Sequence, residues 1–284
     1  MTNVLMLLTT ITFASINSAA LHTIDFSEKG RVFRFNLGCS VIWALVLFIL
    51  GGRLEFSPNI IIFGGIYAAA QVLFLIFKAK AMSLGSISLT TLIGNMSLVL
   101  STIVGVLIWN ESVGISQIIG ILMLIISIII CTYEKSELKN TRGWIICCVL
   151  FFVFAAAVGV IFKAYSKTGE NINNMMLFAS ILMTIFLAIS SAAVRDKTKS
   201  HTKVEKAYIS KLILCGIISC FYNRINIYLS GAMDSVVFFP SFNGGTIILS
   251  AVVGIFAFKE KLKKKQLFGI VMGIASILII GIMK

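Results

Sequence analysis

The sequence predicts an all-α integral membrane protein with ten transmembrane helices, arranged as two inverted five-helix repeats. Three observations lead to this fold class. Hydrophobic residues make up 58% of the 284 residues and charged residues only 12%, which is too little charge to cover a soluble protein of this size. The apolar runs are long enough to cross a bilayer, which takes about 20 residues each. Finally, one stretch of the chain occurs twice.

The repeated stretch covers residues 100–130 and 249–279, which align without a gap at a constant offset of 149 residues. Duplicated blocks of membrane helices build many secondary transporters. Because each copy would hold five spans, an odd number, the second copy must be inverted relative to the first. We therefore expect one repeat at residues 1–133 and a second at residues 143–284. The matched pairs include Gly105/Gly254, Glu111/Glu260, Gln117/Gln266 and Gly120/Gly269.

In the first repeat, the opening run lacks a basic leader and a convincing cleavage site, so we interpret it as a retained helix rather than a signal peptide. Pro58 comes directly before the third span. The fourth and fifth spans belong to the repeated stretch and are separated by a short loop that contains Glu111. The five predicted spans are Val4–Ala20, Arg34–Leu50, Asn59–Phe77, Ile87–Trp109 and Ile115–Thr132.

In the second repeat, the sixth to eighth spans are apolar runs between short polar loops. Pro240 lies inside the ninth span and predicts a kink packed against protein, because backbone groups freed in the bilayer must be satisfied locally. The tenth span completes the second copy of the repeated stretch. The five predicted spans are Trp144–Ala164, Asn173–Val194, Leu212–Ser230, Ser235–Phe258 and Gln266–Met283.

The basic residues set the expected orientation. A net charge of +13 suggests nucleic acid binding in a soluble protein, but here the basic residues are loop charges facing lipid headgroups, and we expect no nucleic acid partner. Lys and Arg cluster in loops 195–211 and 259–265 and are missing from loops 110–114 and 231–234. Cytoplasmic loops carry the excess of Lys and Arg, so both termini are predicted to face outside.

The repeated block resembles the EamA-type family of the drug/metabolite transporter superfamily. The family pattern is a span, Glu, five residues, Gln, two residues, Gly and a second span, and it matches twice, as Glu111–Gln117–Gly120 and Glu260–Gln266–Gly269. The resemblance implies ten spans in two repeats over essentially the whole chain. Two features depart from it. Many members carry Trp-Gly-x-Asn in the first span, where this chain reads Phe-Ala-Ser-Ile-Asn at 13–17, and members commonly have cytoplasmic termini.

Glu111 and Glu260 each precede a span. A carboxylate there can accept hydrogen bonds from the unpaired N–H groups at the start of a helix and interact favourably with its positive end. We therefore interpret both residues as helix caps rather than as catalysts.

Arg224 is the main candidate for anchoring a substrate. It lies deep in the eighth span, with no carboxylate at matching depth in any span. An arginine facing a cavity would bind an anionic group through paired hydrogen bonds. The alternative is that Arg224 snorkels to the membrane interface or bonds helix carbonyls.

Other polar side chains within spans are expected to face a cavity or a partner, because a polar group in hydrocarbon is costly. Tyr67, Gln71, Phe74 and Lys78 recur at helical spacing on one face of the third span. Lys163, near the end of the sixth span, is interpreted as an interfacial residue. The candidate substrate-binding residues are Arg224, Asn95, Gln71, Tyr67, Asn17, Tyr222, Asn223, Tyr228 and Asn243.

These observations favour a secondary transporter in the cell membrane, multi-pass, that moves small polar organic metabolites by alternating access, with amino acids or related carboxylates as the leading substrates. The partners expected are a small-molecule substrate and the lipid bilayer, and the protein is a monomer or homodimer. The chain has two histidines and six cysteines without a CxxC pair, so neither an enzyme nor a metal or other cofactor is expected. A flippase for an amphipathic or lipid-linked substrate and a non-transporting membrane interaction protein are the alternatives.

Overall fold

The structure, a computed structural model, describes residues 2–22, 24, 29–85, 90, 93–132, 142–193, 206–258 and 264–282. Within these residues the chain forms helices joined by short turns. The first half contains α1 (Thr2–His22), α2 (Lys29–Ile49), α3 (Pro58–Leu84), α5 (Ser97–Trp109) and α6 (Ile115–Thr132). The second half contains α7 (Arg142–Ser166), α8 (Ile172–Ala193), α9 (Lys206–Ala232), α10 (Ser235–Phe258) and α11 (Lys264–Ile282).

Each predicted span contains a described helix, which confirms the all-helical prediction. In the fourth span, Ile87–Trp109, α5 begins only at Ser97, and residues 87–89 and 91–92 lie outside the described residues. Seven of the helices in the described ranges are long and apolar enough to cross a membrane. The bounds of α6 and α10 agree with the prediction, whereas α3 continues seven residues beyond Phe77. The predicted span ended at the first lysine, but the helix passes through Lys78 and Lys80 because a helix does not end where the hydrocarbon layer does.

The start of α3 shows how local sequence sets a helix boundary. Pro58 occupies the first helical position, where its missing N–H costs nothing. Ser57 precedes it in extended conformation, and its Oγ accepts a hydrogen bond from Ile60 N at 3.1 Å. The same hydroxyl donates to Glu170 Oε2 at 2.6 Å. The α2–α3 connection is thereby tied to the α7–α8 connection.

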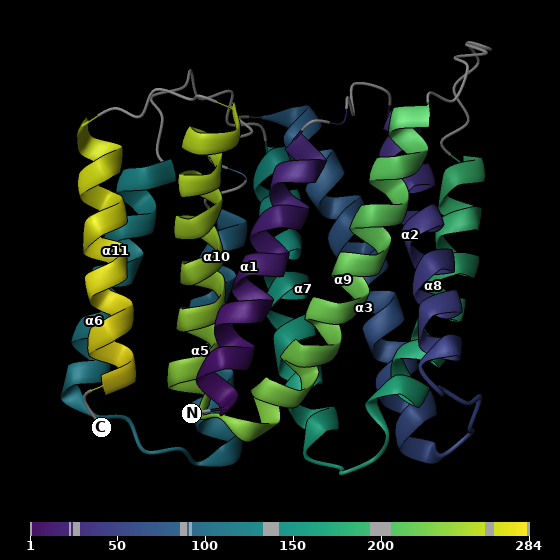
Figure 1. The fold of residues 1–284 in the computed structure, drawn as a ribbon, viewed down its shortest axis with the longest axis horizontal. Coiled ribbons are helices and arrows are strands. Elements are labelled where there is room, and N and C mark those ends of the chain that lie inside the picture. Colours follow the sequence, from purple (N-terminus) through teal and green to yellow (C-terminus); the bar gives the residue numbers. More distant parts are fainter. Residues whose placement is uncertain are drawn as a thin grey trace.

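The helices cross the bundle in alternating directions (Figure 1). We call the end that carries the α2–α3 connection the lower end, as drawn, and the opposite end the upper end. The start of α1 and the end of α11 both lie at the lower end, so the prediction that both termini share a face is confirmed. Corresponding helices of the two halves, such as α1 and α7, run in opposite directions.

Packing between the halves is reciprocal. The third helix of each half packs against the first helix of the other, so α3 contacts α7 and α1 contacts α9. The second helices, α2 and α8, pack together, as do the last helices, α6 and α11. The largest buried cluster lies among α2, α3, α7, α8 and α9 and includes Leu47, Tyr67, Phe162 and Met175.

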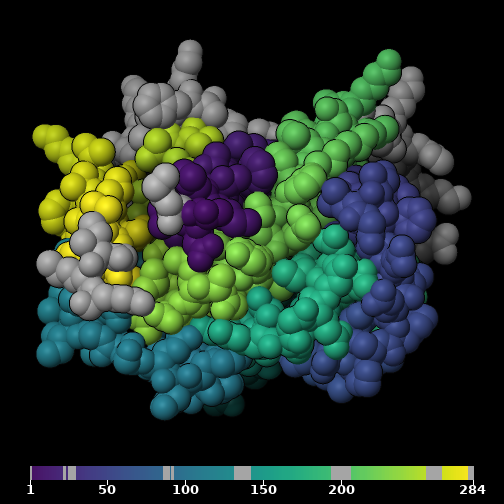
Figure 2. All heavy atoms as spheres, turned by 60° about the horizontal axis from the view of Figure 1, so that its bottom comes forward, coloured from purple at the N-terminus to yellow at the C-terminus, as the bar shows by residue number. Residues whose placement is uncertain are grey.

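The contact between α7 and α9 is not repeated in the first half. The first and third helices of the second half, α7 and α9, pack together, whereas α1 and α3 make no extended contact within the described ranges. The α7–α9 contact is close at the lower end, where a Cβ added to Gly231 would collide with Ser166. Figure 2 shows α1 seated against α9 and α10 as seen from the lower end. The two halves are therefore not packed symmetrically, because the α7–α9 contact adds packing at the lower end that the first half does not match.

Candidate functional site

A buried ion pair joins three separate parts of the chain at the lower end. Lys163 of α7 has 1% of its side chain exposed and pairs with Glu111, whose side chain is 12% exposed. Lys163 Nζ also donates to Met233 O at 3.2 Å and to Ser235 Oγ at 2.7 Å. It lies 5.3 Å from the centre of the Trp109 ring. This network connects α7 with the α5–α6 and α9–α10 connections.

Two sequence predictions are corrected by this network. Glu111 was expected to cap the helix that follows it, but Glu111 Oε2 accepts the backbone N–H of Ser235 at 2.6 Å and so caps α10. At the start of α6, Gln117 Oε1 accepts from Gly114 N at 3.0 Å instead. Lys163 was expected at an interface and is buried, because its charge is paired and hydrogen bonded. Glu260 lies outside the described residues.

Arg224 lies on an exposed face of α9. Its Nε donates to Asn173 Oδ1 of α8 at 2.6 Å. Ile213, Ile217 and Tyr228 are exposed at helical spacing on the same face of α9. Arg224 therefore shares its surface with apolar side chains. This position agrees with the alternative interpretation of the sequence, in which Arg224 snorkels to the membrane interface. These contacts do not test the sequence prediction that Arg224 anchors a substrate.

Gln71 of α3 faces the interior of the bundle. Ile62 and Ile66 are more than half exposed on the outer face of α3, and Gln71 comes nine residues after Ile62, which is roughly 180° around a helix. Gln71 is half-buried and no hydrogen bond joins it to any residue in the described ranges. Lys78 lies on nearly the same face, two turns nearer the upper end, with Nζ 5.7 Å from the Phe74 ring.

Two further amides from other helices lack partners. Asn17 Oδ1 in α1 is buried without a hydrogen bond. Asn95 is half-buried in the helical turn just before α5 and forms no hydrogen bond within the described part of the chain. Buried polar groups are normally hydrogen bonded, so the buried Asn17 Oδ1 is unusual, and the half-buried Gln71 and Asn95 also have side chains that could bind a ligand. We call Asn17, Gln71 and Asn95 the inner amides.

The remaining candidates are satisfied or packed. Asn223 Nδ2 donates to Ser219 O at 2.8 Å, and Asn243 Nδ2 donates to Phe239 O at 2.9 Å, so both bond their own helices. Tyr67 is buried with its ring centre 5.0 Å from that of Phe162. Tyr222 is half-buried, and Tyr228 is 45% exposed. The structure thus does not gather all nine predicted residues into one place.

Sequence reasoning missed the polar contacts at the lower end. Asn174 Oδ1 accepts from Arg53 N at 2.8 Å, and Asn173 Nδ2 donates to Leu50 O at 3.2 Å. Glu170 Oε1 accepts from Asn59 Nδ2 at 2.7 Å. The cluster of Asn and Glu residues at 170–174 was the available signal, since such residues are frequent at helix starts.

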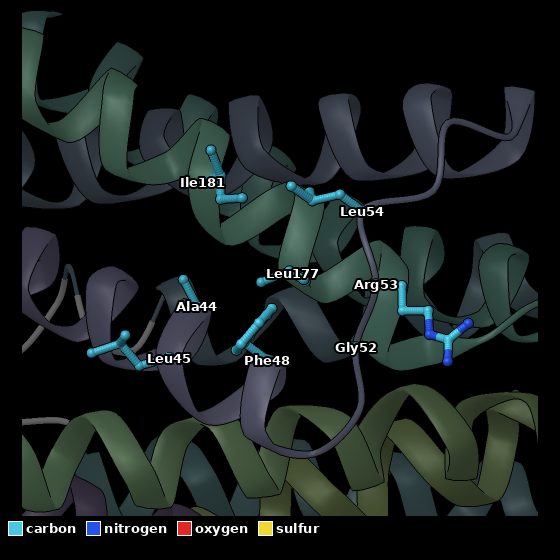
Figure 3. Close-up of a pocket in the computed structure, with 8 residues that line it drawn as sticks. All are labelled: Ala44, Leu45, Phe48, Gly52, Arg53, Leu54, Leu177 and Ile181. Atoms are coloured by element: carbon cyan, nitrogen blue, oxygen red, sulfur yellow. The ribbon is translucent and has the colours of Figure 1, made fainter.

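A groove lies on the outer surface between α2 and α8, with a volume of about 450 Å³. Figure 3 shows Arg53 set apart from the other side chains, on the far side of the 52–54 segment. Apart from Arg53 the lining is apolar, so the groove suits hydrocarbon rather than a polar solute. The apolar lining side chains are Ala44, Leu45, Phe48, Leu54, Leu177 and Ile181.

Comparison with known proteins decides the family. The sequence model of the family described as "Sugar transport protein" matches residues 6–284. The chain belongs to the Sugar transport protein family. Membership, together with the apolar helices, makes the protein a membrane transporter. The family is of the drug/metabolite transporter kind, so the superfamily resemblance holds, whereas the narrower EamA-type assignment is not confirmed.

A solved structure shares the fold of this Sugar transport protein family member. A crystal structure described only as that of a protein matches with a TM-score of 0.77 and 11% sequence identity, covering 99% of this chain and 97% of the other. At that identity the likeness shows the fold alone. A search of curated proteins finds no match to the sequence.

Proposed function

We propose that this protein is a secondary carrier in the cell membrane that moves small polar solutes, with neutral sugars as the substrate class, by alternating access. The observation that carries the proposal is the set of inner amides, Asn17, Gln71 and Asn95, which are unpaired and come from three different parts of the first half. Amides both donate and accept hydrogen bonds, and so do sugar hydroxyls. Three amides around one solute would satisfy several hydroxyls at once.

Neutral sugars fit better than the amino acids or carboxylates expected from the sequence. A carboxylate calls for a cation at the site, but Arg224 is exposed on the outer face of α9. Lys78 lies seven residues beyond Gln71, about 10 Å along the helix toward the upper end. The description of the family supports the same choice.

Alternating access is supported by the arrangement of the two halves. We infer that residues 1–133 and 143–284 form inverted repeats, because corresponding helices run in opposite directions and pack reciprocally. The α7–α9 contact closes the lower end, and within the described ranges α1 and α3 make no extended contact. In an inverted repeat, exchange of these two contacts would close one end and open the other around a central site.

Two alternatives are less well supported. A flippase needs a polar path that opens to lipid, and the groove between α2 and α8 is apolar apart from Arg53. A non-transporting interaction protein does not explain the inner amides, since the burial of Asn17 Oδ1 without a partner costs stability.

The test is binding and transport by the purified protein. We expect thermal stabilisation by one or more neutral monosaccharides, since a ligand that binds the folded state stabilises it, and uptake of the same sugar into proteoliposomes. Gln71→Ala and Asn95→Ala should each weaken binding about three- to tenfold, the effect of losing one neutral hydrogen bond. The matched control is Asn36→Ala, because Asn36 Nδ2 bonds Val32 O of its own helix at 2.8 Å. Equal losses in all three variants, or stabilisation only by amino acids, would contradict the proposal.

A further inference from the structure

We propose that the lower end of the outer surface formed by α2, α8 and α9 binds a phospholipid. Arg53 and Arg224 would hold the phosphate, and one acyl chain would lie in the groove between α2 and α8. This inference is independent of the transported substrate.

The two arginines are attached to the same turn of the chain. Arg53 N donates to Asn174 Oδ1 at 2.8 Å, and Arg224 Nε donates to Asn173 Oδ1 at 2.6 Å. Because Asn173 and Asn174 are consecutive, the start of α8 places both arginines at one level of the bundle. That level adjoins the α2–α3 connection, where the outer surface passes from apolar helices to a polar loop, as expected at the membrane–water interface.

Neither guanidinium is neutralised. Within the described ranges, no carboxylate pairs with Arg53 or Arg224. Two carboxylates lie in this region. Glu170 is occupied, because Oε1 and Oε2 accept from Asn59 and Ser57, and Glu55, two residues after Arg53, forms no ion pair with a described residue. Arg224 uses Nε for Asn173 and keeps its terminal nitrogens for another acceptor. Arginine is well suited to phosphate because its planar group donates parallel hydrogen bonds.

The groove runs from this level toward the middle of the bundle. On α2 it passes Phe48 and then Ala44, and on α8 it passes Leu177 and then Ile181. Each pair is four residues apart, about 6 Å along a helix. Leu45 and Phe48 are 60% and 70% exposed, so the groove is open to the lipid side. Figure 3 shows the guanidinium of Arg53 pointing away from these apolar side chains.

Charge and polarity together select the occupant. A soluble anion would bind the arginines but leave the apolar groove unfilled. A hydrocarbon chain alone would fill the groove but leave the arginines without an anion. A phospholipid has a phosphate at the interface and acyl chains directed into the bilayer, which matches the order found along this surface. Tyr228, 45% exposed on the same face of α9, adds an aromatic side chain of the kind common at headgroup level.

The experiment counts phospholipids that remain bound after purification. Protein is reconstituted into nanodiscs of phosphatidylcholine containing phosphatidylglycerol, extracted in mild detergent, and analysed by native mass spectrometry. We expect one retained phospholipid on the wild type and at least a tenfold loss of the bound form in the Arg53→Gln/Arg224→Gln variant. Arg142→Gln, which removes an exposed arginine at the upper end, should retain it. Leu177→Trp, which fills the groove and leaves both arginines, should lose it.

Three results would overturn the proposal. One is equal retention in the double arginine variant and the wild type. Another is displacement by soluble glycerol phosphate at the concentration of the lipid, which would assign the arginines to a free anion. The third is that a dimer, detected in the same mass spectra, covers the groove in place of the phospholipid, which would assign the groove to a second copy. If the double variant fails to fold, Arg53→Gln alone is the test, because no described residue contacts the Arg53 guanidinium through a hydrogen bond or ion pair.

Discussion

Glu111 accepts a hydrogen bond from the backbone N–H of Ser235, the first residue of a helix that begins 124 residues later in the chain. The same carboxylate pairs with Lys163. A single acidic residue of the first half thus caps one helix of the second half and neutralises the buried cation of another. Removal of its charge should affect both.

We predict that Glu111→Gln lowers the free energy of unfolding by about 3–5 kcal/mol, the usual cost of leaving a buried charge without its partner. Lys163 is 1% exposed and cannot reach water without rearrangement. The measurement is thermal or denaturant unfolding of the purified protein in detergent. Glu170→Gln is the control, since its partners Ser57 and Asn59 are neutral, and it should cost about 0.5–1.5 kcal/mol. Equal losses would show that the Lys163 charge is not what Glu111 stabilises.

We predict that Gly231→Ala destabilises the closed lower end. A Cβ at Gly231 would collide with the side chain of Ser166, so α9 must move away from α7, at a cost of about 1–3 kcal/mol for overpacking. Gly65→Ala in α3 is the matched control, because nothing lies within 4 Å of its added Cβ. That change should be neutral or stabilising by about 0.5–1 kcal/mol. The two variants are compared by thermal unfolding in the same detergent. A Gly231→Ala protein as stable as the wild type would mean that α9 moves away from α7 without cost.

We predict that Arg224→Lys and Arg224→Ala leave sugar affinity unchanged. The Arg224 side chain is exposed on the face of α9 that carries Ile213 and Ile217, away from the inner amides. Affinity measured by thermal shift or by transport is compared with that of Gln71→Ala. A loss of affinity in both folded Arg224 variants would return this residue to the role of substrate anchor.

We predict that the lower end faces the outside of the cell. Single cysteines are introduced, on a background without native cysteines, at Asn110 and Gly169 near the lower end and at Arg142 near the upper end; all three positions are exposed. An impermeant thiol reagent should label the two lower positions in intact cells and leave the upper one unlabelled, because the basic loops belong inside. The reverse pattern would invert the orientation.

The course of the helices could be predicted from the sequence, and their rotation could not. Hydropathy alone places α6 and α10 with their observed bounds, because the length of an apolar run sets a span. Hydropathy does not say which face of a span points inward, so Arg224 and Gln71 looked alike as candidates although one is exposed on the outer face and the other is half-buried toward the interior.

Contacts between residues distant in sequence could not be predicted, for a related reason. Glu111 was assigned to the nearest helix start, four residues ahead, whereas the helix that it caps approaches only through packing of α5 against α10. The cost of burying Lys163 also argued for an exposed position until its three partners were known. Whether a buried charge is paired and hydrogen bonded depends on the tertiary structure, so no local sequence pattern predicts it.

Within the residues that the structure describes, the charged network around Lys163 lies at the lower end of the bundle. The first helix of the other half, α1, contains no charged residue, so it cannot supply an equivalent of Lys163 when the upper end closes. In the proposed alternating-access cycle, the two closed forms would therefore differ in free energy, and the empty carrier should rest with its lower end closed. We expect reorientation without substrate to be the slow step of the cycle, so that unlabelled sugar on the far side of the membrane accelerates tracer flux.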